Sequence, residues 1–127
     1  MSNLFQITQW DESPYLENPD GSKKSLAKIT QQYQGEIEGS SELTYLMSYQ
    51  TAGSALFVGF EVITGTINGK SGSITLQHTG KFEKGVASSE FTFVANSGTD
   101  ELSTLTGTGT FTSGEAGQAS YSLNLTE

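Results

Sequence analysis

The chain has no cysteine, only two prolines and only six basic residues in 127. Without cysteine, disulfides, thiolate nucleophiles and thiolate zinc sites are excluded. All six basic residues are lysines, so the planar guanidinium fork that suits phosphate groups is missing. The 14 acidic residues leave a net charge of −8. This charge balance disfavours nucleic acid and anionic membranes as partners.

Long apolar runs are also missing. Residues 1–10 lack the basic start and continuous apolar segment of a secretory signal, and no stretch is long enough to span a bilayer. We therefore expect a soluble, cytoplasmic protein. The length fits one domain, residues 1–127, with one hydrophobic core. Fifteen glycines could suggest disorder, but 34% hydrophobic residues in regular alternation favour a packed fold.

Apolar and polar residues alternate with a period of two, and no segment has the spacing of a long amphipathic helix. The pattern predicts an all-β fold: a single eight-stranded antiparallel meander β-barrel of lipocalin-like size. We expect strands at residues 3–10, 25–37, 42–50, 55–66, 71–80, 88–95, 103–112 and 118–126.

Turn residues separate these strands. Asn68-Gly69 is typical of a two-residue hairpin turn, because both residues tolerate positive φ. Residues 38–41, 51–54, 83–85 and 113–117 each contain glycine and predict further hairpin loops. Residues 11–24 are polar and hold both prolines, and we expect them to form a long connection that crosses or covers one barrel end.

Alternation also predicts which side chains face the core, since residues two apart share a face. The predicted interior is aromatic with a few polar members: Ile29, Gln31, Tyr33, Ile37, Leu43, Tyr45, Met47, Tyr49, Ile74, Leu76, His78, Leu105, Phe111, Tyr121, Leu123 and Leu125. Gly107 and Gly109 also face inward in this pattern. Two inward glycines in one strand indicate either tight curvature or a space of ligand size.

The segment 55–66 is apolar on both faces. One face carries Leu56, Val58, Phe60 and Val62, and the other carries Phe57 and Ile63 beside Glu61. We expect Glu61 to be solvated, because a one-residue slip decides which way it points. We expect the face with Phe57 and Ile63 to be covered by a second subunit, which predicts a homo-oligomer.

Several motifs resemble a bacterial family known only as a domain of unknown function. They are Gly35-Glu36-Ile37-Glu38-Gly39-Ser40, Gly59-Phe60-Glu61 with Gly65-Thr66, Gly69-Lys70-Ser71-Gly72-Ser73, Gln77-His78-Thr79-Gly80, and Ser97-Gly98-Thr99-Asp100-Glu101-Leu102 followed by Leu105-Thr106-Gly107-Thr108-Gly109. The resemblance implies an eight-stranded barrel similar in fold to plant allene oxide cyclase, which closes a fatty-acid epoxide in an apolar cavity. No cyclase motif matches residue by residue, so no catalytic position is implied.

Five inward polar or aromatic residues are the candidate ligand-binding side chains: Gln31, Tyr33, Tyr45, Tyr49 and His78. His78 is the only histidine and could protonate or polarise a ligand. As a lone imidazole without a mapped partner, it is more often a hydrogen-bonded core residue. Ordinary barrel filling is likewise the alternative for the tyrosines. The catalytic residues, if there are any, stay unknown.

Other patterns predict no cofactor and no metal site. Glu36, Glu38 and Glu42 cluster but lack the spaced oxygen ligands of a calcium loop. The segment 65–71 has one residue too few between its glycines for a phosphate-binding loop, and no helix follows it. Gly107-Thr108-Gly109 lacks the third glycine and the helix of a dinucleotide site. A row of threonines at alternate positions from 104 to 112 is typical of an exposed strand face.

Three functions stay open on this evidence. The first is a barrel that binds a small apolar or amphipathic molecule between aromatic walls. The second is a structural or interaction protein that oligomerises through an outer barrel face. The third is an isomerase or cyclase that needs no cofactor and works by shaping its substrate.

Overall fold

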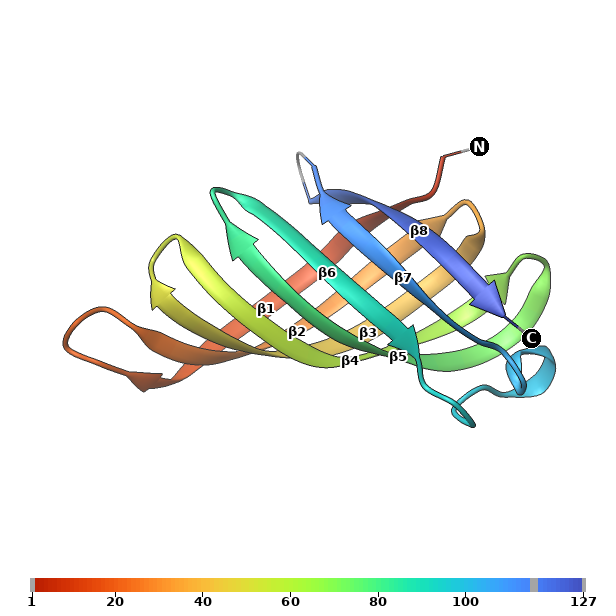
Figure 1. Cartoon of the computed structure of the whole chain (residues 1–127), viewed down its shortest axis with the longest axis horizontal. Helices are drawn as coiled ribbons and strands as arrows, with labels where there is room; N and C mark the ends of the chain where they lie inside the picture. The colour runs from red at the N-terminus through yellow and green to blue at the C-terminus, as the bar shows by residue number, and fades with distance from the viewer. Residues whose placement is uncertain (1, 115–116, 127) are drawn as a thin grey trace.

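The computed structural model describes residues 2–114 and 117–126, which form eight antiparallel strands in one sheet that closes on itself (Figure 1). The predicted meander order is confirmed, since each strand pairs with the next in sequence and β8 returns to β1. The strands are β1 (Leu4–Glu17), β2 (Lys23–Gln34), β3 (Ile37–Thr51), β4 (Ser54–Ile67), β5 (Lys70–Glu83), β6 (Val86–Phe93), β7 (Thr106–Ser113) and β8 (Gln118–Thr126).

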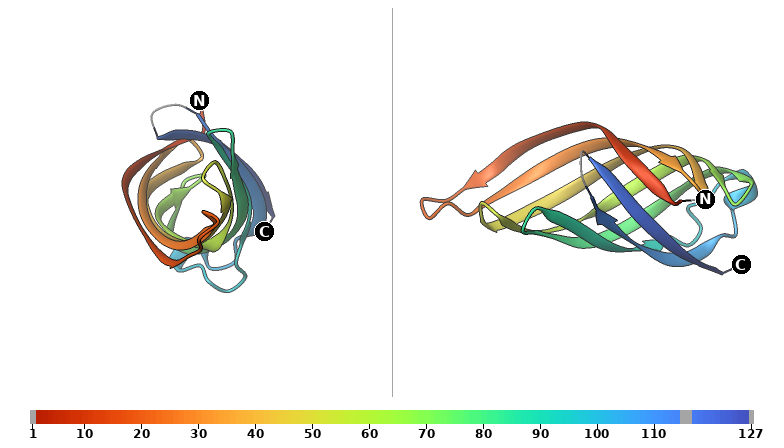
Figure 2. Two further views of the ribbon diagram at one scale, coloured as in Figure 1. Left: turned by 90° about the vertical axis from the view of Figure 1, so that its left-hand side faces the viewer. Right: turned by 90° about the horizontal axis from the view of Figure 1, so that it is seen from above.

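Closure of the barrel depends on a short seam. β1 pairs with β8 only from Leu4 to Gln6, whereas it pairs with β2 from Leu4 to Glu17. The outer half of β1 is therefore a free sheet edge, and the barrel tapers toward the β1–β2 hairpin (Figure 2). Sheet edges tolerate proline, which explains why Pro14 lies within a strand.

Two predicted loops are wrong. Residues 11–17, expected in a long connection over one end, continue β1, so that only residues 18–22 connect β1 to β2. Residues 38–41, expected to be a hairpin loop, lie inside β3. The true turn is at residues 35–36, where Gly35 has a φ of 105°. The Asn68-Gly69 turn is confirmed, with φ angles of 49° and 84°.

The predicted interior is largely confirmed. The buried apolar residues are Phe5, Ala27, Ile29, Ile37, Leu43, Tyr45, Met47, Ala55, Phe57, Ile63, Ile67, Ile74, Leu76, Phe91, Phe93, Leu102, Leu105, Phe111, Ala119 and Tyr121. Gly109 faces inward as expected, but the space beside it holds the Phe91 ring, which a Cβ atom would meet at 2.4 Å. That glycine therefore accommodates an aromatic side chain of the core and leaves no room for a ligand.

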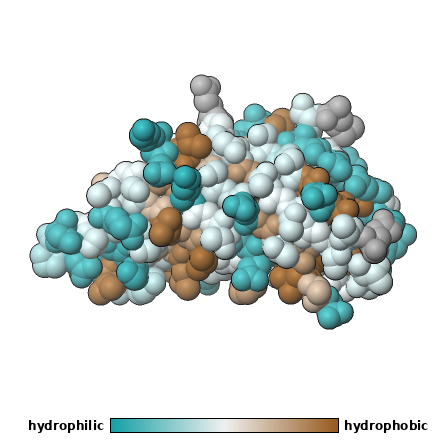
Figure 3. All heavy atoms as spheres, in the orientation of Figure 1, coloured by the Kyte–Doolittle hydropathy of each residue, from teal (hydrophilic) through white to brown (hydrophobic). Residues whose placement is uncertain are grey.

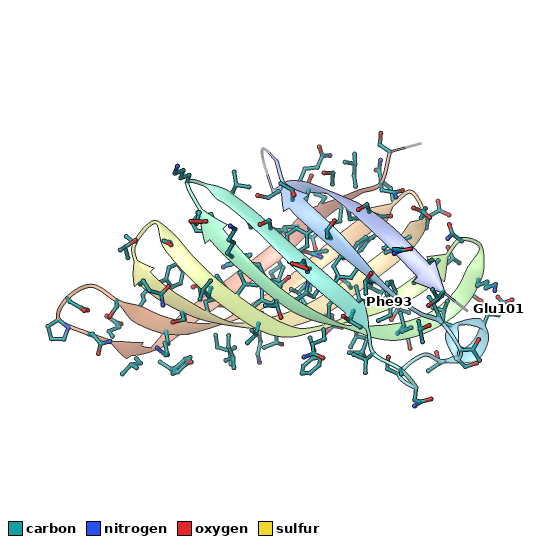
Figure 4. The ribbon with its side chains drawn as sticks, viewed as in Figure 1. Phe93 and Glu101 are labelled. Carbon is teal, nitrogen blue, oxygen red and sulfur yellow. The ribbon has the colours of Figure 1, made fainter. Side chains whose placement is uncertain are left out.

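One end of the barrel is closed by the connection between β6 and β7. It carries a short 3₁₀ helix, η1 (Asp100–Leu102), whose Leu102 is buried. Figure 4 shows Phe93, where β6 ends, and Glu101 of η1 at this same end. The Glu101 carboxylate accepts hydrogen bonds from the Ser71 amide and hydroxyl, which lower its pKa. No helix of the described residues is long and apolar enough to cross a membrane.

The outer surface corrects the expectation for β4. Phe57 and Ile63 face the interior and are almost fully buried, so no subunit can cover them. The exposed apolar side chains of β4 belong to the opposite face and are Leu56, Val58, Phe60 and Val62, and the exposed Leu46 of β3 lies beside them. Apolar residues also gather along the lower margin of the molecule in Figure 3, where β4 passes in Figure 1.

Candidate functional site

Three polar side chains meet in the middle of the barrel, on three neighbouring strands. Glu61 of β4, His78 of β5 and Ser89 of β6 all point inward and are buried. His78 Nε2 lies 2.7 Å from Glu61 Oε1, and His78 Nδ1 lies 2.7 Å from Ser89 Oγ. The imidazole thus bridges a carboxylate and a hydroxyl, with both ring nitrogens bonded.

The second carboxylate oxygen of Glu61 is bonded to β2. Tyr33 Oη donates to Glu61 Oε2 at 2.5 Å, and Gln31 Nε2 donates to the same oxygen at 3.1 Å. Gln31 Nε2 also donates to Tyr33 Oη at 3.3 Å. Five side chains therefore form one continuous network across the interior, which we call the polar layer: Gln31, Tyr33, Glu61, His78 and Ser89.

Burial of Glu61 overturns the expectation that it is solvated. The residue is fully buried, and its side chain is 1% exposed. A buried carboxylate is costly unless it is paired and hydrogen-bonded. Here His78, Tyr33 and Gln31 all bond to its oxygens, which makes the buried position tenable.

Burial also keeps the neighbouring tyrosines protonated. Desolvation, followed by the nearby Glu61 charge, raises the pKa of Tyr33 well above its ordinary value. The same two causes raise the pKa of Tyr45. Both phenols therefore keep their protons at neutral pH and can act as hydrogen-bond donors.

An apolar cavity of about 190 Å³ adjoins the polar layer. It extends toward the end of the barrel where the β5–β6 and β7–β8 hairpins turn. Its walls come from most of the strands and are mainly aromatic or aliphatic: Phe5, Ile7, Trp10, Ile29, Gln31, Tyr45, Met47, Tyr49, Phe57, Phe82, Ala87, Phe111, Ser113, Gly117, Gln118 and Ala119. None of these lining residues carries a charge.

Two polar residues line this cavity with a side-chain polar atom that lacks a protein partner. Tyr45 and Gln31 are each 5% exposed. Among residues 2–114 and 117–126, neither the Tyr45 hydroxyl nor Gln31 Oε1 has a hydrogen-bond partner. Ser41 Oγ is the only side-chain polar atom of the described residues that is both fully buried and unpartnered, so the polar atoms of Tyr45 and Gln31 keep some accessible surface. These two are therefore available to a molecule in the cavity.

A second polar cluster lies beside the outer part of the cavity. Glu12 accepts hydrogen bonds from Tyr49 Oη at 2.9 Å, from Trp10 Nε1 at 3.0 Å and from the Ser25 hydroxyl. Burial alone would raise the pKa of Glu12, but these bonds and the Lys23 ammonium outweigh it and lower that pKa. Trp10 and Tyr49 line the cavity, so this carboxylate holds two of its aromatic walls in place.

The five residues predicted to bind a ligand divide between two places. Gln31, Tyr45 and Tyr49 line the cavity, whereas Tyr33 and His78 lie in the polar layer beyond it. Sequence reasoning missed the roles of Glu12 and Ser89, and it placed Glu61 outside. The only available signal was the inward parity that Glu61 shares with Phe57 and Ile63.

Ser89, His78 and Glu61 follow the order of a serine–histidine–carboxylate catalytic triad, but their position in the barrel does not suit catalysis. A nucleophile must reach a reacting atom, and Ser89 is 5% exposed and does not line the cavity. No three histidine, cysteine, aspartate or glutamate side chains of the described residues gather closely enough to hold a metal ion. The arrangement of these residues therefore fits a ligand-binding site better than a catalytic site with a serine nucleophile or a metal ion.

Comparison with known proteins places the chain in a family. A structure of a protein of unknown function from Shewanella oneidensis, assigned to the DUF3224 family, has 27% sequence identity and a TM-score of 0.75. The match covers 99% of this chain and 97% of the Shewanella chain. No curated protein matches the sequence. The model of the family described as "Protein of unknown function (DUF3224)" matches residues 1–125, and the chain therefore belongs to this family.

Proposed function

We propose that the barrel binds a small, uncharged and mainly apolar molecule in the cavity between the polar layer and the hairpin end. The observation that carries this proposal is the combination of apolar walls with two polar groups, from the cavity-lining residues Gln31 and Tyr45, that lack a protein partner. Small-molecule sites typically have mostly apolar walls and a few oriented polar groups.

The size of the cavity limits the ligand. An engineered apolar cavity of about 150 Å³ binds benzene, so 190 Å³ fits a molecule of about ten non-hydrogen atoms. Charged ligands are disfavoured, because no lining residue provides a counter-ion.

The first test is native mass spectrometry of freshly purified protein before and after mild organic extraction. We expect a retained small molecule that extraction removes. The matched variant is Ala119→Met, which places a longer side chain in the cavity. Thr108→Met makes the same kind of change on the exposed outer face of β7 and serves as the control. The retained mass should disappear in the Ala119 variant alone.

The second test adds 4-propylphenol to the extracted protein and follows the fluorescence of Trp10, the only tryptophan and a wall of the cavity. Saturable binding that Ala119→Met weakens at least tenfold, with no change in Thr108→Met, would support the proposal. Failure of this probe to bind, or equal binding by the Ala119 variant, would refute it.

A second candidate function is self-association through the exposed face of β3 and β4. Leu46, Leu56, Val58, Phe60 and Val62 are each between 44% and 59% exposed. A shallow groove lies beside them, and its rim carries Lys28 together with Asp11 and Glu42. Both charge signs are therefore present on one face, so two copies related by a two-fold axis can pair them despite the overall negative charge.

A standard interface buries about 800 Å² from each partner, so a dimer through this apolar strip would also have to use the adjoining groove. We propose a second copy of the chain as the occupant. Analytical ultracentrifugation of Phe60→Glu should show a monomer where the unmodified protein shows a dimer. Thr108→Glu adds the same charge to β7 and should leave the dimer intact. A monomeric unmodified protein would refute this candidate.

A further inference from the structure

We infer that Glu61 fixes the hydrogen-bonding polarity of the cavity, so that the site selects ligands whose inner end donates a hydrogen bond, such as an uncharged alcohol or phenol. This inference rests on the proposed function and makes its ligand class specific. Glu61 does not line the cavity and would act through Gln31, which makes it a positioning residue.

The argument begins with the carboxylate, whose oxygens accept hydrogen bonds and, when ionised, donate none. Gln31 Nε2 lies 3.1 Å from Glu61 Oε2. With the side-chain amide reversed, a carbonyl oxygen would face a carboxylate oxygen, and the two lone pairs would repel. The NH₂ group of Gln31 must therefore point to Glu61, which leaves Gln31 Oε1 for the cavity.

Tyr33 strengthens this constraint. Its hydroxyl donates its one proton to Glu61 Oε2, so toward Gln31 it can only accept, and Gln31 Nε2 lies 3.3 Å from it. Two acceptors on two different strands thus require the same orientation of the Gln31 amide. A ligand that meets Gln31 must supply a proton, since an ether, a ketone or a hydrocarbon would leave the buried carbonyl unpaired.

Tyr45 further restricts the class of ligand that the cavity can bind. Tyr45 lines the same cavity, and burial and the Glu61 charge raise the pKa of its hydroxyl and keep its proton in place. It can therefore donate to a ligand oxygen. A hydroxyl group offers both the proton that Gln31 needs and an oxygen that Tyr45 can bond. A carboxylic acid is disfavoured, because it is ionised in water and the uncharged cavity beside Glu61 offers no counter-ion for its charge.

The test compares two probes of nearly equal size, 4-propylphenol and 1-methyl-4-propylbenzene, in which a methyl group replaces the hydroxyl. The readout is the ratio of their dissociation constants, because a general loss of packing would change both probes together. The unmodified protein should prefer the phenol. In Glu61→Gln, the new amide can donate to a reversed Gln31, and the preference should fall at least fivefold.

Two further variants separate positioning from folding. Tyr33→Phe removes a neighbour of Glu61 but leaves the carboxylate facing Gln31, so it should keep the preference. Gln31→Met removes the carbonyl from the cavity and should lose the preference even if Glu61→Gln does not fold. Retention of the preference in folded Glu61→Gln or in Gln31→Met, or equal binding of both probes by the unmodified protein, would overturn the inference while the cavity still binds. Binding of neither probe would reject the proposed function itself.

Discussion

The pairing of Glu61 with His78 predicts a strong, non-additive effect on stability. Glu61→Leu would leave two donors, His78 Nε2 and Tyr33 Oη, without their acceptor, and Gln31 Nε2 with only its 3.3 Å bond to Tyr33 Oη. Each unsatisfied buried group costs about 1–3 kcal/mol, and removal of one partner of a buried pair costs about 3–5 kcal/mol. We expect a loss of about 4 kcal/mol for Glu61→Leu and about 3 kcal/mol for His78→Leu.

The double variant should lose less than the sum of the two. It removes both members of the pair, so that neither is left buried alone, and replacement of both partners by apolar residues is often close to neutral. Tyr33, Gln31 and Ser89 still lose a partner. We therefore expect a coupling of about 2 kcal/mol between the two sites.

Urea unfolding followed by far-ultraviolet circular dichroism measures these values. With a slope of about 1–3 kcal/mol per molar urea, each single variant should lower the midpoint by about 2 M. The control is Lys81→Ala, which breaks the exposed Lys81–Glu83 pair at 3.3 Å and should cost less than about 0.5 kcal/mol. Losses below about 1 kcal/mol in the single variants, or a double variant equal to their sum, would refute the reasoning.

Three further predictions concern single features of the fold. Ser41→Ala should raise the free energy of unfolding by about 1 kcal/mol, because Ser41 Oγ is buried without a partner among the described residues; an unchanged or lower urea midpoint would contradict this. Gly109→Ala should cost about 1–3 kcal/mol, because its Cβ would meet the Phe91 ring and a backbone oxygen, and a midpoint within error of the unmodified protein would be the contrary result. Burial raises the pKa of Tyr49 and of Tyr121 to about 12, so the stability that these protonated phenols contribute is complete below pH of about 10 and is lost as the pH rises toward 12. A midpoint that stays flat across this alkaline range would count against it.

The strands and their faces could be predicted from the sequence because they depend on local patterns. Alternation along residues 43–49 and the Asn68-Gly69 turn need only neighbouring residues to be interpreted. The structure confirms the inward face of β3 and this hairpin. Closure into a barrel also follows from the number of strands and their meander order.

The length of β1 could not be predicted in this way. Residues 11–17 are polar and include Pro14, features that normally indicate a loop. They continue the strand because β2 supplies a partner as far as Glu17, while the missing β8 partner leaves an edge where proline is tolerated. This pairing depends on where the barrel closes, which is a property of the whole sheet.

The orientation of β4 was also beyond local patterns. Both of its faces are apolar, so counting hydrophobic residues did not decide between them. The face with Glu61 is inside because His78 on β5 and Tyr33 and Gln31 on β2 provide its partners. Those residues are far from Glu61 in the sequence, and only the register of the closed sheet brings them to the carboxylate.

Stability alone does not explain the polar layer, since a buried pair of ionisable side chains is often no more stabilising than well-packed apolar residues. The Glu61→Leu/His78→Leu variant separates the two roles. Its loss of stability should be about 2 kcal/mol smaller than the sum of the two single losses, because no lone member of the pair is left buried. It should not regain the preference for 4-propylphenol, because no carboxylate then orients the Gln31 amide. A stability loss below that sum, together with a lost preference, would show that the layer serves the cavity.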